Sequence, residues 1–325
     1  MAKQLRMGVI GCGAIANAHL PAQRALEEIT TVAVCDINEQ AARERAEEFE
    51  VESVYRDYHD LLADDHVDAV AILLPHHLHR DCALAAAQAG KHILCEKPMA
   101  ISLAEADEMI AAADSAHVVL MIAQILRFRP ANLRARELIR DGAIGQVKNV
   151  IRRRYGKSGD PGRDWALKPE EAGGWVLYGY GSHEIDMILW LNDAEAREVY
   201  AQGQRNNPSW DDYDEISIEM RLSNEAIASM HHSTNSPVGA WDCLVIGTEG
   251  GMLIESESIL LNGEAVELSL DSPAAHQAQT GEFATAVFEG REPEASGRDV
   301  RKSMAALEAA KLSIAEGRIV NAAEL

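Results

Sequence analysis

A short apolar run that ends in a glycine-rich turn opens the chain and most constrains its fold. Residues 5–10 predict a strand, and the next six residues form a G-x-G-x-x-A turn that opens a helix. In such a turn the first glycine permits a tight bend, and the second lets the backbone approach a pyrophosphate. The small last residue lets the helix pack on the strand. The turn alone would fit any glycine-rich strand-to-helix connection, but it predicts a dinucleotide site that includes Gly11, Cys12, Gly13, Ala14 and Ile15.

An acidic residue at the end of the second predicted strand strengthens this interpretation. The strand over residues 31–35 ends in Asp36, which lies 25 positions after Gly11. A carboxylate there can accept hydrogen bonds from both ribose hydroxyls and would repel a 2′-phosphate. The pattern therefore favours NAD over NADP, with NADP left open. Asp36 could also help to cap the helix that Asn38 opens, which is compatible with the cofactor role.

Strands and helices continue to alternate through the first 123 residues. Further strands are predicted over residues 67–73, 92–95 and 118–123, with helices between them. This order implies a parallel, doubly wound sheet with right-handed crossovers. Such sheets bind ligands beyond the carboxyl ends of their strands. The residues expected at those ends, and hence beside the cofactor, are Leu74, Pro75, His76, His79, Glu96, Lys97 and Gln124.

The histidines in the loop after the strand over residues 67–73 also suggest a metal site. His76, His77 and His79 lie within four positions of one another. A zinc site needs three or four ligands and partners that orient each imidazole. No convincing further ligand set is visible in the sequence, so we predict no metal and expect loop histidines near the cofactor.

The alternation of strands and helices stops after the helix predicted from Pro130 to Gly142. Successive strands with short turns follow over residues 146–155, 198–204, 214–222, 226–232, 243–247 and 252–255. Helices interrupt them over residues 181–191 and 300–315. Short connections between strands indicate antiparallel pairing. We therefore predict a Rossmann domain over residues 1–123 and an α+β domain with a large, mainly antiparallel open sheet over residues 124–325, the C-terminal helix packing back on the first domain.

Charge and cysteine content restrict the partners and the compartment. The formal charge of −22 argues against nucleic acid or an anionic membrane as a partner. Five cysteines without a CxxC pair favour a reducing, cytoplasmic location over a disulfide scaffold. No apolar run approaches the roughly 18 residues that a membrane helix needs. We expect a small-molecule substrate.

Several short motifs, taken together in their order and spacing, carry a resemblance over nearly the whole chain. The chain resembles the glucose–fructose oxidoreductase/inositol dehydrogenase (Gfo/Idh/MocA) family. The resemblance implies a pyridine-nucleotide oxidoreductase that acts on a carbinol of a sugar, polyol, sugar acid or related small molecule, and a homodimer or homotetramer. Besides the first turn and Asp36, the motifs are Glu96-Lys97-Pro98, Arg127-Phe128-Arg129-Pro130, residues 142–145, Asp164-Trp165, residues 169–174 and His183-Glu184-Ile185-Asp186.

The resemblance also assigns catalytic roles. Lys97 matches the lysine that lies beside the nicotinamide and the substrate hydroxyl, and His183 matches the acid/base histidine. Asp186, one helical turn later on the same face, matches a supporting acid. Alcohol oxidation must remove the hydroxyl proton as hydride leaves. A histidine with an ordinary pKa near ~6.5 suits that proton better than a lysine near ~10.4. Lys97 would then orient the oxygen and stabilise the developing alkoxide.

One position departs from the family pattern, Asp-x-Gly-x-His. Gly179 stands where the aspartate is expected, so a carboxylate that could bind substrate is missing. Tyr178 and Tyr180 flank this position, and either could hydrogen-bond substrate or be a core aromatic. Trp165, in the loop over residues 158–169 with Arg163, is a further candidate for substrate contact, as is Arg127.

Two arginines later in the chain offer another hypothesis. Arg152 and Arg154 share one face of a predicted strand. That face is either simply solvated or, if an arginine lines the pocket, suited to a carboxylated substrate.

Two other functions stay open besides an NAD-preferring dehydrogenase. One is a non-catalytic NAD-binding regulatory protein on the same fold, which the glycine at position 179 keeps in view. The other is an NAD-dependent hydrolase or lyase that oxidises its substrate transiently and returns the hydride. Retention of both Lys97 and His183 favours the dehydrogenase over the regulatory protein.

Overall fold

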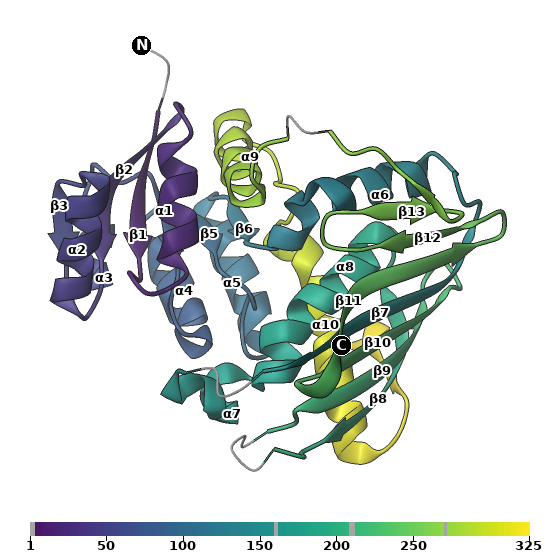
Figure 1. The fold of residues 1–325 in the computed structure, drawn as a ribbon. Coiled ribbons are helices and arrows are strands. Elements are labelled where there is room, and N and C mark those ends of the chain that lie inside the picture. The colour runs from purple at the N-terminus through teal and green to yellow at the C-terminus, as the bar shows by residue number, and fades with distance from the viewer. Residues whose placement is uncertain (1–3, 159–161, 208–211, 270–271) are drawn as a thin grey trace. The chain divides into compact units, whose positions relative to one another are not determined.

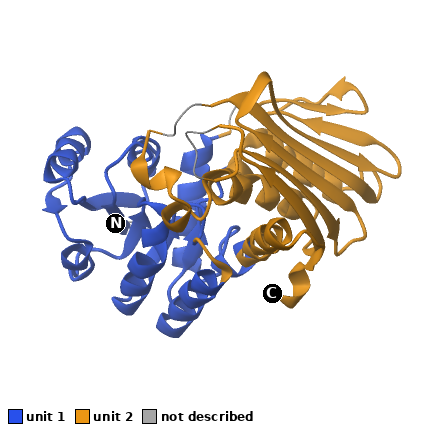
Figure 2. Cartoon of the chain, turned by 90° about the horizontal axis from the view of Figure 1, so that it is seen from below, with its two compact units in different colours: residues 1–100, 104–125, 273–300 blue, residues 101–103, 126–272, 301–325 orange. Residues whose placement is uncertain are grey.

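The computed structural model describes residues 4–158, 162–207, 212–269 and 272–325. Contacts between residues divide the chain into two compact units. Figure 2 colours unit 1, residues 1–100, 104–125 and 273–300, in blue and unit 2, residues 101–103, 126–272 and 301–325, in orange. Each unit has its own sheet, and each is described by itself.

Unit 1 is built on a six-stranded parallel sheet in the order β3-β2-β1-β4-β5-β6. This is the order of a doubly wound dinucleotide-binding sheet, and it confirms the predicted fold class. The strands are β1 (Leu5–Ile10), β2 (Ile29–Cys35), β3 (Ser53–Tyr55), β4 (Ala69–Ile72), β5 (His92–Cys95) and β6 (Leu120–Ile122). The α-helices between them are α1 (Ala16–Arg24), α2 (Glu39–Phe49), α3 (Tyr58–Leu62), α4 (His79–Gln88) and α5 (Leu103–Ala116).

The central strands of this sheet are buried on both faces, as their apolar sequences require. All four residues of β4 and the last three of β5 are buried. The predicted cap of α2 is confirmed, because the Asn38 side chain accepts hydrogen bonds from the backbone N–H groups of Gln40 and Ala41. Because all six strands run in parallel, the residue that follows each strand lies at the same edge of the sheet.

A helix that the sequence analysis did not predict completes unit 1. Helix α9 (Ala275–Glu289) lies beside α1 in Figure 1, far from it in sequence. The rings of His19 and His276 meet edge to face at 5.6 Å. The buried side of α9 includes Gln279 and Thr280 as well as Phe283. Because polar and small residues lie on that side, the helix lacks the apolar stripe by which amphipathic helices are found in sequence.

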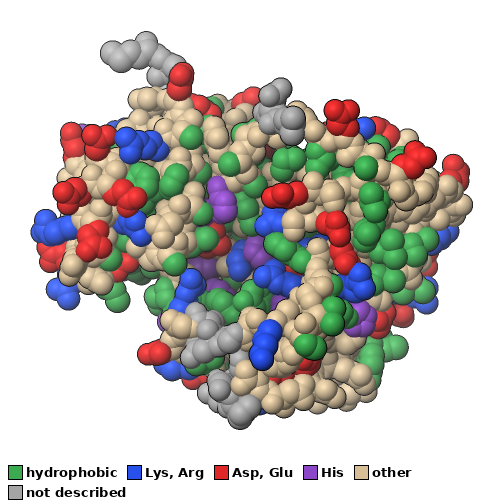
Figure 3. Space-filling view, viewed as in Figure 1, with side chains coloured by type: hydrophobic (Ala, Val, Ile, Leu, Met, Phe, Trp, Pro, Cys, Tyr) green, Lys and Arg blue, Asp and Glu red, His purple; other side chains and the backbone are tan. Residues whose placement is uncertain are grey.

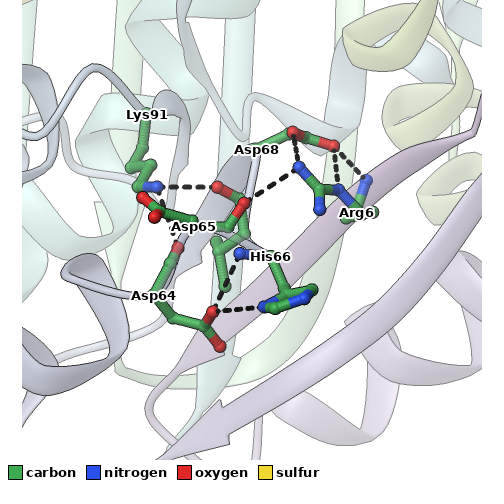
Figure 4. A network of polar contacts seen from close by, with 7 residues as sticks. Arg6, Asp64, Asp65, His66, Asp68 and Lys91 are labelled. Atoms are coloured by element: carbon green, nitrogen blue, oxygen red, sulfur yellow. Dashed lines mark hydrogen bonds and ion pairs between the residues drawn. The ribbon is translucent and has the colours of Figure 1, made fainter.

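A polar network fixes the turn that leads into β4. Arg6 donates from Nε to Asp68 at 2.9 Å and from Nη2 to the same carboxylate at 2.6 Å (Figure 4). The Nζ of Lys91 donates to the backbone carbonyls of Asp64 and Val67 at 3.0 and 2.8 Å. These contacts lie at the amino ends of β1, β4 and β5, the edge opposite the one where such sheets bind ligands, so their role is structural.

Unit 2 is built on a nine-stranded sheet in the order β14-β13-β12-β11-β7-β10-β9-β8-β15. Among the described strands of this second sheet, only β7 and β10 pair in parallel. The other neighbours are antiparallel, which confirms the predicted mainly antiparallel sheet. The strands are β7 (Val147–Lys157), β8 (Ala196–Gln204), β9 (Glu215–Leu222), β10 (Ile227–Ser233), β11 (Asn235–Gly247), β12 (Gly251–Ile254), β13 (Ile259–Leu261), β14 (Glu264–Ala265) and β15 (Val320–Asn321).

Helices cover one face of this sheet. Helix α8 lies against β7 and β10, and every one of its residues is buried (Figure 1). Burial alternates along β9, as expected of a sheet with one covered and one open face. The helices of this part of the chain are α6 (Pro130–Arg140), α7 (Pro169–Ala172), α8 (Gly181–Leu191) and α10 (Gly297–Glu316), with a π-helix, η4 (Trp175–Tyr180), directly before α8.

On the face of the molecule drawn in Figure 3, acidic side chains lie scattered rather than in one patch. The sequence has 52 Asp and Glu residues against 30 Lys and Arg residues. Among the described residues, no helix has both the length and the apolar character needed to cross a bilayer.

Candidate active site

The glycine-rich turn after β1 has the geometry of a phosphate cradle. Gly11 has φ of +104°, and a Cβ there would lie 2.4 Å from the backbone oxygen of Leu73, so only glycine fits. A Cβ built on Gly13 meets no atom within 4 Å. Helix α1 follows, and its N-cap residue Ile15 makes no side-chain capping bond. Open space in front of a helix N-terminus suits a pyrophosphate. The turn therefore fits the predicted cofactor.

Asp36 follows β2 and is held in a fixed orientation. Its Oδ2 accepts a hydrogen bond from the backbone N–H of Cys12 at 2.8 Å, and its Oδ1 accepts one from Asn38 N–H at 2.8 Å. The side chain is half-buried. The carboxylate thus lies against the glycine-rich turn, and its contact with the ribose hydroxyls stays a prediction.

The loop after β4 is tied to the Glu96-Lys97-Pro98 turn by His79. The Nδ1 of His79 lies 2.8 Å from the carbonyl oxygen of Pro98, and its Nε2 lies 2.8 Å from that of Leu74. Burial lowers the pKa of this imidazole, and the two carbonyls act in the opposite direction. The ring therefore joins two loops, and direct contact of His79 with the cofactor stays a prediction. His76 is also buried, with its ring 5.9 Å from that of His79.

Glu96 anchors the turn that carries Lys97. Its Oε1 lies 2.7 Å from Nε2 of His19 on α1, and its Oε2 accepts a hydrogen bond from the backbone N–H of Lys97 at 3.1 Å. Burial acts to raise the pKa of Glu96, but the hydrogen bond and charge of His19, followed by the charge of Lys97, outweigh it, so the pKa is lowered. Lys97 is half-buried at the carboxyl end of β5, and Gln124 is buried after β6.

In unit 2, helix α8 carries His183, Glu184 and Asp186 in its first two turns. His183 is 9% exposed, whereas Glu184 and Asp186 are fully buried. Arg127 donates to both oxygens of Asp186, and Ser303 Oγ donates to Oδ1 at 3.0 Å. Arg127 is itself buried, so its guanidinium is engaged by a carboxylate of the protein. Direct contact of Arg127 with substrate stays a prediction.

Arg152 and Arg154 both bind Glu184, so the interpretation of their face as simply solvated was wrong. Arg152 is 5% exposed and donates from Nε to Glu184 Oε2. Arg154 donates from Nη1 to Oε1 at 3.0 Å. Burial acts to raise the pKa of Glu184, but the two arginines outweigh it and lower the pKa. The sequence could not exclude the solvated alternative, because Glu184 comes from helix α8, which covers the sheet.

Aromatic rings continue from the start of α8 across unit 2. Trp165 meets Trp175 at 5.5 Å, Trp175 meets Tyr180 at 5.6 Å, and Tyr180 stacks on His232 at 4.9 Å. Of the loop that carries Trp165, residues 159–161 lie outside the described part of the chain. Tyr178 is fully buried, and its hydroxyl donates to Glu308 at 2.7 Å, which gives it a place in the core. Tyr180 is half-buried, and the Cζ of Arg154 lies 4.4 Å from its ring centroid.

Among the described residues, no group of three or more His, Cys, Asp or Glu side chains has the arrangement of a metal site. The three loop histidines differ in their surroundings, since His79 bridges two carbonyls and His76 packs against it.

Two family models match the chain in the order of its two sheets. Residues 5–124 match the oxidoreductase family with an NAD-binding Rossmann fold, and residues 132–253 match the GFO/IDH/MocA C-terminal domain. The chain belongs to the Gfo/Idh/MocA oxidoreductase family. Membership confirms the resemblance and, with it, the predicted NAD-binding oxidoreductase class.

Relatives and solved structures in this family span the whole chain. The myo-inositol 2-dehydrogenase of Thermotoga maritima is 27% identical over 340 residues, covering 99% of each chain. The crystal structure of the aldose–aldose oxidoreductase from Caulobacter crescentus, complexed with glycerol, has a TM-score of 0.92 at 27% identity and covers 98% of this chain and 100% of its own. Levoglucosan dehydrogenase in complex with NADH and levoglucosan has a TM-score of 0.90 at 25% identity and covers 98% of this chain and 99% of its own.

The sequence analysis missed residues that this Gfo/Idh/MocA protein gathers around the start of α8. His232 stacks on Tyr180, and Trp241 lies close to both Arg154 and Arg129, although Arg129 was noted only as part of a motif. His232 and Trp241 come from neighbouring positions on β10 and β11, opposite Arg154 of β7. To place His232 and Trp241 beside Arg154, one needs the register of these strands, which cannot be derived from the sequence.

Proposed function

We propose that the protein is an NAD-dependent dehydrogenase that oxidises a carbinol of a sugar, polyol or related small hydroxy compound. The observation that carries this proposal is the Glu96–Lys97 turn at the carboxyl end of β5. There a largely buried carboxylate, held by His19, fixes the backbone of Lys97 in a dinucleotide-binding sheet. The names of the inositol and levoglucosan dehydrogenases support the substrate class.

Each catalytic residue has a separate role in this proposal. NAD, when bound, supplies the acceptor for the hydride that leaves the carbinol carbon. Lys97 donates a hydrogen bond to the substrate oxygen and stabilises the developing alkoxide. His183 accepts the hydroxyl proton as general base. Asp186, held by Arg127 and Ser303, supports the helix turn from which His183 extends.

The remaining residues of the site bind cofactor or substrate in this proposal. The cofactor would contact the glycine-rich turn and the loops that follow β2, β4, β5 and β6. Tyr180 and Trp165 belong to one series of ring contacts, which supports a role for both in substrate binding. The hydroxyl of Tyr178 binds Glu308, so for Tyr178 a core role is the better supported one.

NAD is the preferred cofactor in this proposal because of Asp36. Its carboxylate is held by two backbone N–H groups, so it can accept hydrogen bonds from ribose hydroxyls and would repel a 2′-phosphate. Replacing Asp36 with alanine should narrow the ratio of kcat/KM for NAD over NADP. A wild-type protein that already prefers NADP would contradict the assignment.

We further propose a homodimer or homotetramer in a reducing, cytoplasmic compartment. The five cysteines, all within the described residues, are buried free thiols, which supports the compartment. The open face of the nine-stranded sheet is available for self-association. Light scattering of the purified protein tests the oligomer; a monomer at micromolar concentration would contradict it.

The substitution Lys97→Met tests the proposed chemistry. The variant should bind NADH as the wild type does, measured by NADH fluorescence. It should lose about 10²- to 10³-fold in kcat when NADH formation is followed with polyols and aldoses. Lys148→Met, an exposed lysine on β7, is the matched control and should leave kcat unchanged. Retained turnover by Lys97→Met would refute the lysine role.

A further inference from the structure

Three arginines of unit 2 surround one tryptophan. The Cζ atoms of Arg129, Arg154 and Arg152 lie 4.5, 4.9 and 6.0 Å from the ring centroid of Trp241. Arg152 and Arg154 come from β7, Trp241 lies opposite Arg154 on β11, and Arg129 directly precedes helix α6. Guanidinium groups stack well on aromatic faces, but three so close together repel one another unless anions compensate.

The protein compensates only part of this charge. Glu184 binds Arg152 and Arg154 with one carboxylate. The nearby Asp242 is bound by Arg153, whose side chain lies on the opposite face of β7. Within the described part of the chain, no carboxylate lies within ion-pair distance of Arg129. Among the charges that act on it, Glu184 and more weakly Glu257 are the acidic ones.

Arg129 is therefore a half-buried cation without a hydrogen-bonded anion in the described structure. Burial lowers the pKa of its guanidinium, and the charges of Arg152 and Arg154 lower it further. Such a surplus of positive charge is notable in a protein with a formal charge of −22. Repulsion among these arginines raises the free energy of the unliganded protein, and a bound anion would reduce this repulsion.

A cavity of about 230 Å³ lies beside Arg154 and Trp241 in unit 2, and Arg129 contacts the same Trp241 ring from outside the lining of the cavity. Arg154, Tyr180, His232, Ser233, Thr234 and Trp241 are among its lining residues. His232 is 3% exposed, and its Nδ1 has no hydrogen-bond partner among the described residues; the same is true of Nε1 of Trp241. Burial lowers the pKa of His232 to about 4, so the ring is neutral at pH 7. Buried polar atoms without partners indicate a place for ligand hydroxyls.

We propose that this cavity binds the carboxylate-bearing end of a sugar acid, such as a uronate or an aldonate. Arg154 receives the carboxylate beside the Trp241 ring, and Arg129, on the same ring, adds positive charge from outside the lining of the cavity. His232 and Trp241 bond neighbouring hydroxyls. The proposal rests on the dehydrogenase function proposed above and narrows its substrate class. A carboxylate replaces a terminal hydroxymethyl group at nearly the same size. A phosphate adds several heavy atoms, which a cavity below the usual ~300 Å³ of ligand sites disfavours.

Matched pairs of acidic and neutral substrates test this inference. NADH formation is measured with D-glucuronate against D-glucose, D-galacturonate against D-galactose, and D-gluconate against sorbitol, with D-glucose 6-phosphate as a further arm. At least one acid should exceed its neutral partner in kcat/KM by about 10-fold or more, as expected of a charge-assisted hydrogen bond. The inference would be overturned if each neutral compound had the same kcat/KM as its acid, or if D-glucose 6-phosphate had a higher kcat/KM than the acids.

The variant Arg129→Gln separates local binding from overall charge. It should lower kcat/KM for the acid by about 10-fold, mainly through KM, because one positive charge near the carboxylate is lost, and leave the neutral compound within about 3-fold. Among the described residues Arg129 makes no ion pair, and its side chain makes no helix-capping bond, so the variant should fold. Arg153→Gln makes the same charge change on the open face of β7 and should leave the ratio unchanged. Equal effects of both variants would overturn the inference.

Direct binding distinguishes failure of this inference from failure of the proposed function. D-glucuronate, D-galacturonate and D-gluconate are titrated into the wild type and Arg129→Gln by calorimetry, with NADH present at saturation. Binding of an acid that Arg129→Gln weakens by about 10-fold or more supports the inference even if no compound yields NADH, a result that would refute only the dehydrogenase. NADH formation from neutral compounds alone, with no acid bound, would keep the dehydrogenase and refute the carboxylate site.

Discussion

The Arg127 guanidinium donates two hydrogen bonds to the Asp186 carboxylate, from Nε to Oδ2 and from Nη2 to Oδ1, each of 2.7 Å. Both side chains are about 98% buried or more, and Ser303 donates a third bond to the same carboxylate. A buried pair of this kind stabilises little relative to apolar residues, but removing one partner leaves a charge without compensation. The pair therefore fixes helix α8 where it carries His183.

The variant Arg127→Met should lower the free energy of unfolding by about 3–5 kcal/mol, because Asp186 loses its counter-ion in a buried place. The double variant Arg127→Met/Asp186→Leu should recover part of that loss, since no buried charge is then left unpaired. Urea denaturation at pH 7 measures both. Arg134→Met, which breaks an exposed pair with Glu137, is the control and should change stability by less than about 1 kcal/mol. A double variant less stable than the single one would contradict this account.

The sequence predicted the helix that carries His183 and Asp186 but not the partner of the aspartate. Arg127 lies 59 positions before Asp186, and no spacing rule joins residues so distant. The same limit applies to Glu184. It pairs with Arg152 and Arg154 of β7, two arginines whose strand face could have been solvated on the sequence alone. Strand and helix positions follow from local patterns, whereas pairing across elements depends on register and packing.

His19 and Glu96 form a second pair, which should control the turn that carries Lys97. The pKa of Glu96 is lowered in the folded protein, so its carboxylate contributes stability above its ordinary pKa of about 4.5, and this contribution is lost as pH falls through the lowered value. His19→Leu should reduce stability at pH 7 by about 1–3 kcal/mol, because a buried carboxylate loses its hydrogen bond. The gap to the wild type should shrink toward pH 4.

Activity gives an independent measure of that pair. His19→Leu should also lower kcat, because Glu96 accepts the backbone N–H of Lys97 and would lose its own anchor. His19→Gln retains an N–H donor and serves as the conservative comparison. It should recover most of kcat. If both variants lose stability equally while kcat stays at the wild-type value, His19 has only a packing role.

His232 should make the protein sensitive to mild acid. Its folded-state pKa is about 4 because of burial, against an ordinary value of 6.5. The unfolded chain therefore takes up a proton near pH 6.5, whereas the folded protein does so only near pH 4. Stability falls across this window, by roughly 3 kcal/mol in total. Urea denaturation between pH 7 and pH 4 measures the free energy of unfolding at each pH. This free energy should fall less steeply with decreasing pH in His232→Phe than in the wild type. His231→Phe, on the opposite face of β10, should keep the wild-type slope.

The order of elements was the most predictable level of this fold. Five of the six parallel strands and the antiparallel character of the second sheet follow from apolar runs and turn residues. The π-helix η4 (Trp175–Tyr180) and helix α9 were missed, because neither shows an apolar stripe at helical spacing. The residues at the carboxyl edge of the first sheet could be named in advance, because in a parallel sheet they directly follow the predicted strands; their contacts with NAD stay predictions. His232 and Trp241 were not predictable, since strand register places them beside Arg154, and Arg129 was not, since it reaches the Trp241 ring from the residue before α6.

The two glycines of the first turn should respond differently to alanine. At Gly11 the φ of +104° and a Cβ 2.4 Å from Leu73 O predict a loss of stability of more than about 1 kcal/mol. At Gly13 a Cβ meets no atom within 4 Å, so Gly13→Ala should fold with stability within about 0.5 kcal/mol of the wild type. The added methyl should nevertheless raise the Kd for NAD by about 10-fold or more, since it fills the space that the pyrophosphate needs. Calorimetric titration with NAD, beside thermal unfolding, measures both effects. Unchanged NAD affinity in a folded Gly13→Ala protein would place the phosphates elsewhere.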